Sequence, residues 1–232
     1  MKVKNNYQEC ITNLACSIEK YFDLTPKHNT LSYVDKLLEE KKPENVIVIL
    51  LDGLGSRILD RSLDENAFLR KYKVKEITSV FPATTTAATS SMQTGLNPVE
   101  HGYLGWNIYM EPIDKVITIY MNTEKGKEVP DQDFLNIKDQ YYKLHTIPER
   151  IEEEKKGRGI ELFPFQKDIY QGLDDMLEKI KNYTKEPGKK YIYAYNTEPD
   201  STMHRLGPDS KEAQALIQER NDKIEALSKE LD

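Results

Sequence analysis

Asp52 is the first residue of the chain whose type and position suggest metal chemistry. It follows the apolar run Val46 to Leu51 and precedes a glycine, in the sequence VIVILLDG. Carboxylate oxygens are preferred ligands of hard cations, and open α/β sheets bind their ligands beyond the carboxyl ends of the strands. A capping role at the start of the next helix explains Asp52 equally well. Taken alone, the residue leaves both interpretations open.

A cluster of hydroxyl side chains, Thr84 to Thr86, occurs in the segment FPATTTAATSSMQTG. The predicted strand-to-helix turn places these hydroxyls at a helix N-terminus, where backbone N–H groups and the helix dipole favour an anion. A coordinated metal lowers the pKa of a hydroxyl, which makes threonine a usable nucleophile. Capping and packing are the simpler roles of such a cluster and, taken alone, the commoner ones.

Asp200 and His204 stand four residues apart in the sequence EPDSTMHRLGPDS. One helical turn would place both on the same face, where a carboxylate and an imidazole suit joint coordination of one metal ion. The same spacing is common by chance on polar surfaces. Here it follows the apolar sequence YIYAY and is flanked by Pro199, Gly207 and Pro208. This context favours a site.

The elements that must position these residues alternate along the chain. Strand patterns occupy residues 46–51, 73–80, 115–121, 159–165 and 189–196. Helical spacing of apolar residues predicts helices over 7–21, 31–41, 63–71, 86–94, 167–183 and 209–231. This alternation predicts an α/β fold with a mainly parallel central sheet and helices on both faces. Residues 1–232 are interpreted as one partial domain, with residues 124–150 as a cap or insertion segment.

The amino-acid composition limits which binding partners and which cellular location we expect. The 232 residues are 38% hydrophobic and 31% charged, which is typical of a folded globular chain. The net charge of -6 gives no support to nucleic acid or an anionic membrane as partner. The longest apolar run is too short to span a bilayer, and the N-terminus lacks a secretory signal pattern. With Cys10 and Cys16 interpreted as reduced thiols, we expect a cytoplasmic protein.

Together, the three segments resemble the alkaline phosphatase superfamily, and most of all its type I phosphodiesterase/nucleotide pyrophosphatase family. That family has a strand ending in Asp-Gly, then Phe-Pro-x-x-Thr, Thr-Gly-x-x-Pro-x-x-His-Gly and Glu-Pro-Asp-x-x-x-His-x-x-Gly-Pro. This chain has LLDGLG, FPATTTAATSSMQTGLNPVEHG and EPDSTMHRLGP in the same order, between residues 46 and 208. Three ordered motifs are far more specific than any one of them.

The resemblance implies a site with two divalent metal ions, usually zinc. Asp52 would bind one ion, and Thr85 would bridge to that ion and attack phosphorus. Asp200 and His204 would bind the other ion. Thr85 is preferred to its neighbours because it lies four residues after Phe81, where the family has its nucleophile.

The chain departs from the family pattern at the asparagine that donates a hydrogen bond to a phosphoryl oxygen. Counting from Thr85 puts Trp106 at that position. We assign the role to Asn107, one residue later. Trp106 would then either stack on an aromatic leaving group or simply pack. His101 matches a family position and is interpreted as structural.

A second departure is larger, because the family's later Asp-His-Gly motif and its further histidine are missing. The chain has only four histidines, and none lies in such a motif. Each metal ion would therefore have too few protein ligands for a stable catalytic zinc site. We expect the chain to be the N-terminal portion of a longer enzyme, incomplete at its C-terminus and inactive alone.

The expected function is that of a metal-dependent phosphate-ester hydrolase, a phosphodiesterase or nucleotide pyrophosphatase acting on small nucleotide-like substrates. A phosphomonoesterase or phosphonate hydrolase of the same superfamily is the alternative within this chemistry. A catalytically inactive relic that keeps the fold without complete metal sites is the alternative outside it. The sequence does not separate these possibilities, because it does not identify the residues that would grip a second ester group. It also leaves the oligomeric state open.

Overall fold

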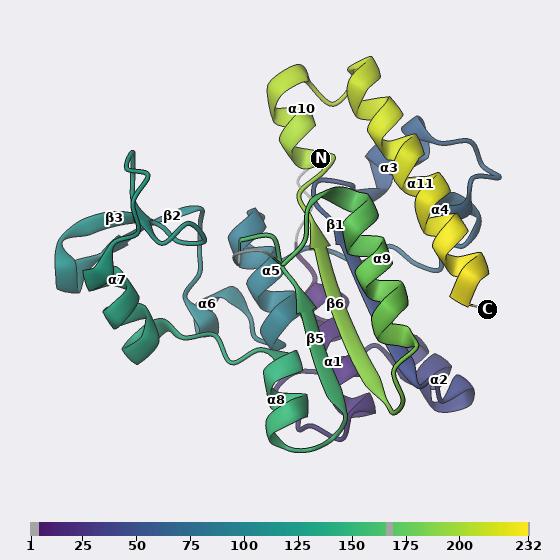
Figure 1. Cartoon of the computed structure of the whole chain (residues 1–232), viewed down its shortest axis with the longest axis horizontal. Coiled ribbons are helices and arrows are strands. Elements are labelled where there is room, and N and C mark those ends of the chain that lie inside the picture. The colour runs from purple at the N-terminus through teal and green to yellow at the C-terminus, as the bar shows by residue number, and fades with distance from the viewer. Residues whose placement is uncertain (1–4, 166–168, 232) are drawn as a thin grey trace. The chain divides into compact units, whose positions relative to one another are not determined.

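The computed structural model describes residues 5–165 and 169–231, which divide into two compact units. The first unit comprises Met1–Pro43 and Ile77–Gly159, and the second comprises Glu44–Glu76 and Ile160–Asp232. The chain therefore passes between the units three times (Figure 1). Neither unit is a continuous stretch of sequence.

The second unit is built on a parallel sheet with the strand order β1-β6-β5. Strands β1 (Asn45–Leu51) and β6 (Lys190–Asn196) pair in parallel along their whole lengths, from Asn45 opposite Lys190 to Leu51 opposite Asn196. Strand β5 (Arg158–Leu162) completes the sheet. The sheet confirms the predicted α/β class, and it confirms strands at the two apolar runs VIVILL and YIYAY.

Helices α9 (Gly172–Thr184) and α11 (Lys211–Leu231) pack together beside β6 (Figure 1). Side chains alternate along a strand, so Ile192 and Ala194 of β6 enter the same core as the apolar faces of these helices. Tyr191, Tyr193 and Tyr195 point to the opposite face. The remaining helices of this unit are α3 (Ser56–Ser62), α4 (Phe68–Lys71) and α10 (Asp200–Leu206).

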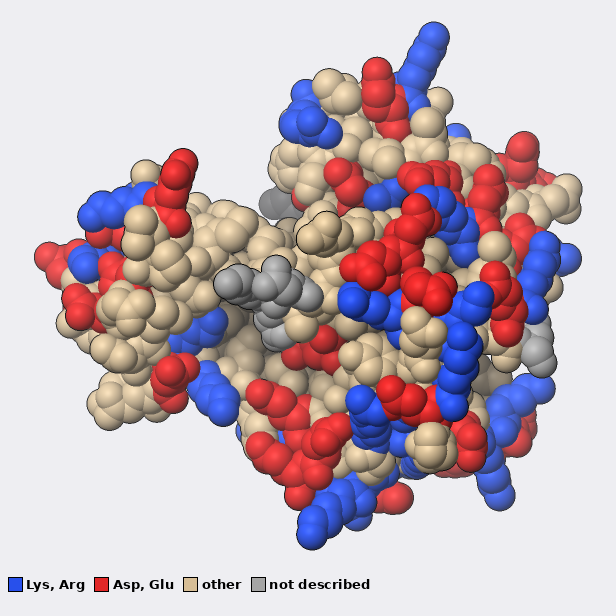
Figure 2. Space-filling model, viewed as in Figure 1, with Lys and Arg blue, Asp and Glu red and all other residues tan. Residues whose placement is uncertain are grey.

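The outer surface of α9 and α11 carries both signs of charge. Figure 2 shows basic and acidic side chains interspersed over these helices on the face that it presents. Lys223, for example, lies 2.7 Å from both Asp174 and Glu219. No helix in the described part of the chain has the length and apolar character needed to cross a membrane.

The first unit is mainly helical, with α1 (Ile11–Tyr21) packed against both α2 (Ser32–Lys41) and α5 (Thr85–Thr94). Cys10 and Cys16 are buried free thiols at the start of α1 and within it. The unit also contains α6 (Pro98–His101), α7 (Gln132–Ile137), a π-helix (Lys138–Tyr142), α8 (Ile147–Glu153) and a 3₁₀ turn (Glu111–Ile113). Whether residues 124–150 serve as a cap stays a prediction.

A small antiparallel sheet completes the first unit, with the order β2-β3-β4. Strands β2 (Asn107–Met110) and β3 (Lys115–Thr118) form a hairpin, and β4 (Thr123–Glu124) pairs with β3. The strand predicted over 115–121 therefore exists in shortened form. It belongs to this local sheet and not to the parallel one.

One predicted strand is wrong, and one predicted helix is confirmed only in its last turn. Residues 73–80 form no strand, although Thr78 makes an isolated bridge to Cys10. The apolar residues of this segment alternate as in a strand, but Val74 is 79% exposed because no neighbouring strand buries it. The helix predicted over 63–71 is present only as the single turn α4, because α3 ends before it and Leu63 is extended. Asp64, which follows Leu63, is of the type that favours turns over helix interiors.

Helix α9 begins at Gly172, five residues after the predicted start of its helix at 167. Residues 167 and 168 lie outside the described residues, so that part of the prediction has no structural counterpart here. Helices α1, α2, α5 and α11 agree with their predicted ranges to within four residues.

Candidate active site and metal ligands

Asp52 and Asp200 lie at the carboxyl edge of the parallel sheet. Asp52 comes directly after β1, and Asp200 begins α10 shortly after β6 ends. The Asp52 N–H donates to the Asn196 carbonyl at 3.0 Å, and the Asp200 N–H donates to the Asp52 carbonyl at 3.1 Å. Because β1 and β6 are parallel and in register, these backbone bonds bring the two carboxylate-bearing residues together. This edge is where α/β sheets bind ligands.

Gly53 permits this close approach. Its φ is +72°, in the left-handed region that favours glycine. A Cβ atom at this position would lie 2.7 Å from Met203 Cε and 2.9 Å from Asp200 Oδ1. The Asp-Gly pair that closes β1 therefore has two functions, because the glycine makes room for α10 beside the aspartate.

Asp200 and His204 share one face of α10, as their spacing predicts. His204 Nε2 lies 3.3 Å from Asp200 Oδ2. The His204 side chain is 79% exposed, and the Asp200 side chain is 29% exposed. An oxygen and a nitrogen donor therefore converge at an accessible position on a single helical turn. Their role as metal ligands stays a prediction.

Tyr195 supports Asp52 and was not identified from the sequence. Its buried hydroxyl donates a hydrogen bond to Asp52 Oδ2 at 2.6 Å. The two residues are 143 positions apart, and a tyrosine in an apolar strand looks like packing until the register of β1 against β6 is known. Fixing one carboxylate oxygen orients the other, which is how outer groups tune metal ligands.

Arg220 is a second supporting residue at this edge of the sheet. Its Nε donates to Asn196 Oδ1 at 3.1 Å, and the residue is 4% exposed. Burial lowers the pKa of the Arg220 guanidinium, while Glu219 and Glu198 nearby raise it. The sequence does carry a signal for Arg220, because a charged residue on the apolar face of an amphipathic helix needs a buried partner.

The donor atoms of this edge fit a divalent metal by type. Two carboxylates and one imidazole are common zinc ligands. Within residues 5–165 and 169–231, however, no three His, Cys, Asp or Glu side chains form a group that could hold a metal ion. Asp52, Asp200 and His204 would therefore supply only part of the coordination that two ions require.

The three consecutive threonines of the first unit occupy different positions. Thr84 is the N-cap of α5, where its Oγ1 accepts a hydrogen bond from the Ala87 N–H at 3.4 Å. Thr86 is fully buried. Thr85 is the first residue of the helix and is only half-buried. Of the three, Thr85 thus combines a place in the first helical turn with access to a ligand.

Asn107 and Trp106 lie at the start of the β2–β3 hairpin. The Asn107 side chain is exposed, and its Oδ1 accepts a hydrogen bond from Thr118 Oγ1 at 2.8 Å. The amide nitrogen is then the group that Asn107 would offer to a phosphoryl oxygen. Trp106 is 36% exposed and packs edge-on against Tyr120, with the ring centroids 6.0 Å apart.

His101 has a structural environment. Its Nδ1 accepts a hydrogen bond from the Tyr103 N–H at 3.0 Å, and its Nε2 lies 3.1 Å from Ser91 Oγ. Burial lowers the pKa of His101 to about 4. The imidazole is therefore neutral at pH 7 and ties α6 to α5 within the first unit.

The predicted site residues divide between the units. Asp52, Asp200 and His204 lie in the second unit, and Thr85 and Asn107 lie in the first. The structure places Asp52 and Asp200 at one sheet edge, and His204 lies beside Asp200 on α10. The approach of the Thr85 hydroxyl to Asp52 stays a prediction.

Comparison with known proteins supports the resemblance to a family over part of the chain. The sequence profile described as type I phosphodiesterase / nucleotide pyrophosphatase matches residues 46–141, which confirms the resemblance inferred from the motifs. A search of curated proteins gave no match.

Among solved structures, the chain is similar to murine ectonucleotide pyrophosphatase / phosphodiesterase 5, determined as an inactive threonine-to-alanine variant in complex with AMP. The TM-score is 0.57 at 21% sequence identity, over 79% of this chain and 51% of that one. The chain thus spans about half the length of the structure that it matches, and the likeness shows the fold.

Proposed function

We propose, from the premise that residues 46–141 carry the sequence of the type I phosphodiesterase / nucleotide pyrophosphatase family, that the whole protein is a metal-dependent hydrolase of phosphodiester or pyrophosphate bonds in nucleotide-like substrates. The observation that carries the proposal is the pair of backbone hydrogen bonds that holds Asp52 and Asp200 together beyond the ends of β1 and β6. The 232-residue chain alone, with incomplete metal coordination, is proposed to be inactive.

Thr85 is the proposed nucleophile. Its support is its half-buried position at the first residue of α5, between a capping Thr84 and a buried Thr86. The murine relative is inactive when a threonine is changed to alanine, and it binds AMP. Both properties are consistent with a threonine nucleophile and a nucleotide substrate.

The proposed reaction has two displacements. The Thr85 hydroxyl loses its proton to solvent and its oxygen forms a bond to phosphorus, while the bond from phosphorus to the leaving oxygen breaks and the leaving oxygen takes up a proton from water. Asn107 would donate its amide N–H to a phosphoryl oxygen during this step. A water molecule then attacks phosphorus and the bond from phosphorus to the Thr85 oxygen breaks, which releases a phosphomonoester, while the Thr85 oxygen takes up a proton and becomes a hydroxyl again.

Asp52, Asp200 and His204, together with the Thr85 hydroxyl, are the residues that would hold the proposed pair of divalent ions, expected to be zinc. When bound, such ions offset the charge that develops on phosphorus oxygens and lower the pKa of a coordinated hydroxyl or water. Tyr195 would keep the Asp52 carboxylate oriented through its 2.6 Å hydrogen bond.

The nucleophile is tested in the whole protein supplied with zinc. Thr85→Ala should lower kcat on bis-p-nitrophenyl phosphate by about 1,000-fold or more, because no neighbouring hydroxyl shares its position. Thr84→Ala is the matched control, and it should lose helix stability rather than turnover. If Thr85→Ala kept most of the activity and Thr84→Ala did not, Thr84 would be the nucleophile.

The substrate class is tested by comparing two chromogenic esters. The proposal expects a higher kcat/KM on bis-p-nitrophenyl phosphate than on p-nitrophenyl phosphate. The reverse order would favour a phosphomonoesterase.

A catalytically inactive binding domain is the second candidate. The observation that favours it is the lack of a three-residue metal group in the described part of the chain. It predicts AMP binding without turnover and without zinc dependence in the whole protein. Zinc-dependent hydrolysis would exclude it.

A further inference from the structure

Tyr120 joins the turn after β3 to the first turns of α5. The residue is 6% exposed, and its hydroxyl contacts three groups of that helix. Its oxygen lies 3.2 Å from the Thr86 carbonyl oxygen and 3.1 Å from Ser90 Oγ, and it makes a short hydrogen bond with Thr89 Oγ1. A single buried phenol thus meets consecutive turns of the helix that Thr85 begins.

These contacts lead directly to Thr85. The Thr89 hydroxyl donates to the Thr85 carbonyl at 2.8 Å, so its oxygen is left to accept the proton of Tyr120. The Ser90 hydroxyl can donate to the Tyr120 oxygen in turn. One consistent set of hydrogen bonds therefore runs from Ser90 through Tyr120 and Thr89 to the backbone of Thr85.

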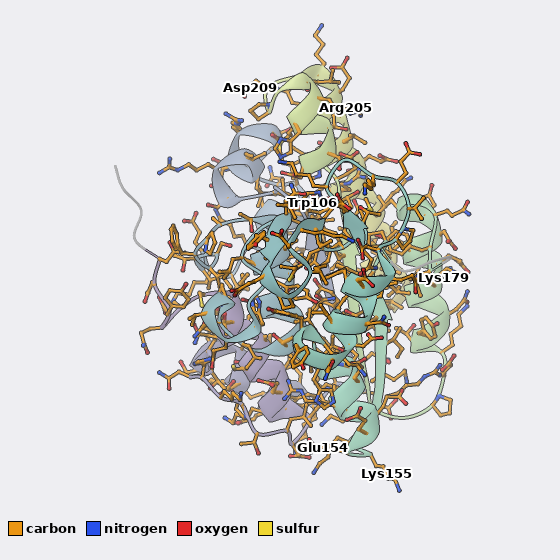
Figure 3. The ribbon with its side chains drawn as sticks, turned by 90° about the vertical axis from the view of Figure 1, so that its left-hand side faces the viewer. Trp106, Glu154, Lys155, Lys179, Arg205 and Asp209 are labelled. Atoms are coloured by element: carbon orange, nitrogen blue, oxygen red, sulfur yellow. The ribbon has the colours of Figure 1, made fainter. Side chains whose placement is uncertain are left out.

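The Tyr120 ring also packs against the segment that contains Trp106 and Asn107. It packs edge-on against Trp106, which Figure 3 labels, with the planes 84° apart, and against Tyr103 at 6.4 Å. The Ile119 N–H, directly before it, donates to the Trp106 carbonyl at 3.1 Å. Tyr120 therefore links the Trp106–Asn107 segment to the start of α5 within one unit.

We propose that Tyr120 is a positioning residue for Thr85. Its hydroxyl fixes the first turns of α5 relative to Asn107 and Trp106, and so fixes the direction from which the threonine hydroxyl attacks. Reaction rates fall steeply when a reacting group is displaced by a fraction of an ångström to an ångström. The inference rests on the proposed function, because it assigns Tyr120 a role only if Thr85 reacts.

The first test removes the Tyr120 hydroxyl and keeps the ring. In the whole protein with zinc, Tyr120→Phe should lower kcat on bis-p-nitrophenyl phosphate by about tenfold while KM stays within about twofold. Thr89→Val removes the next hydroxyl in the series at nearly constant shape, and it should lower kcat in the same way. It also keeps the proposal testable if Tyr120→Phe folds poorly.

Tyr103→Phe is the matched control. Tyr103 is an equally buried phenol in the same aromatic cluster, but its hydroxyl donates to the Tyr142 carbonyl at 2.9 Å and not to α5. It should leave kcat within about twofold of the parent. If Tyr103→Phe lowered kcat as much as Tyr120→Phe, a general loss of packing would explain both and the positioning role would be wrong.

Two readouts do not depend on turnover. Amide hydrogen exchange in Tyr120→Phe should speed up in the first two turns of α5 and not in its last turn. In the 232-residue chain, whose only tryptophan is Trp106, fluorescence should report an unchanged environment of the indole ring in Tyr120→Phe. Unaltered exchange in α5 together with unaltered kcat would overturn the proposal. A Thr85→Ala protein with full activity would instead overturn the proposed function itself.

Discussion

At the scale of single residues, His101 shows how burial sets a protonation state. Its Nδ1 accepts a backbone N–H bond, which requires that nitrogen to be unprotonated. Burial lowers its pKa from 6.5 to about 4, so the charged form is disfavoured in the folded protein. In the unfolded chain the same imidazole takes up a proton near pH 6.5.

This difference predicts an acid-sensitive fold. The contribution of His101 is complete above pH 6.5 and is lost as the pH falls from 6.5 towards about 4, because the unfolded state binds the proton more readily. The whole loss is roughly 3 kcal/mol. Urea denaturation of the full chain at several pH values should show this slope.

His101→Asn, which keeps an acceptor for the Tyr103 N–H, should flatten the slope between pH 6.5 and 4. The exposed His145 serves as the control, and His145→Asn should leave the slope intact. Equal slopes in the parent and in His101→Asn would contradict the prediction.

The sequence predicts which side chains converge where the contact is local. Asp200 and His204 are four residues apart, so one turn of helix decides that they converge. Tyr195 and Tyr120 could not be predicted, because their hydroxyls meet partners that only the folded arrangement brings near. Thr84 and Thr86 could be separated from Thr85 only by burial and capping, which the sequence TTT does not encode.

At the scale of secondary structure, helix α5 is held at both ends. Thr84 caps its start, and Gly95, with φ of +70°, ends it. Arg150 of α8 donates to the Thr94 carbonyl at 3.0 Å and pairs with Glu19 of α1, whose side chain is 2% exposed. Burial raises the pKa of Glu19, and Arg150 opposes that effect. Arg150 therefore joins α8 to α1 and to the C-terminal end of α5, the helix that begins with Thr85.

Arg150→Met should destabilise the protein by about 3–5 kcal/mol, because it leaves the Glu19 carboxylate buried without its partner. The free energy of unfolding from urea titration at pH 7 measures this loss. The double variant Glu19→Gln and Arg150→Met should recover part of it, since the unpaired charge is gone. A single variant as stable as the parent would show that water reaches Glu19 in its place.

The error in predicting a strand over residues 73–80 has a physical origin in long-range pairing. Alternation in residues 73–80 satisfies the strand pattern, but Val74 remains exposed because no adjacent strand takes up the backbone hydrogen bonds. The strands at 46–51 and 189–196 succeed because their long apolar runs can be buried only within a sheet. Periodicity predicts which face of a strand is apolar, but pairing with a strand distant in the sequence decides whether that face is buried.

At the scale of the whole molecule, the parallel sheet depends on segments far apart in the sequence. Every residue of β1 has its ladder partner in β6. A chain that ends at Lys189 keeps VIVILL but loses β6, and the exposed apolar strand should drive aggregation. Sedimentation should find this truncated chain in large assemblies.

A chain that ends at Leu206 is the control for this truncation, because it keeps β6 and α10 and loses only α11. It should remain more soluble than the chain ending at Lys189. Equal solubility of the two would show that β6 does not protect β1.

The separation of β1 from β6 also has a consequence in the cell. About 140 residues must be synthesised between the last residue of β1 and the first of β6, which takes a ribosome roughly 7–28 s. During that interval the nascent chain exposes an apolar segment whose pairing strand has not yet been synthesised. Chaperones that recognise short aliphatic stretches would find their earliest target at Val46 to Leu51.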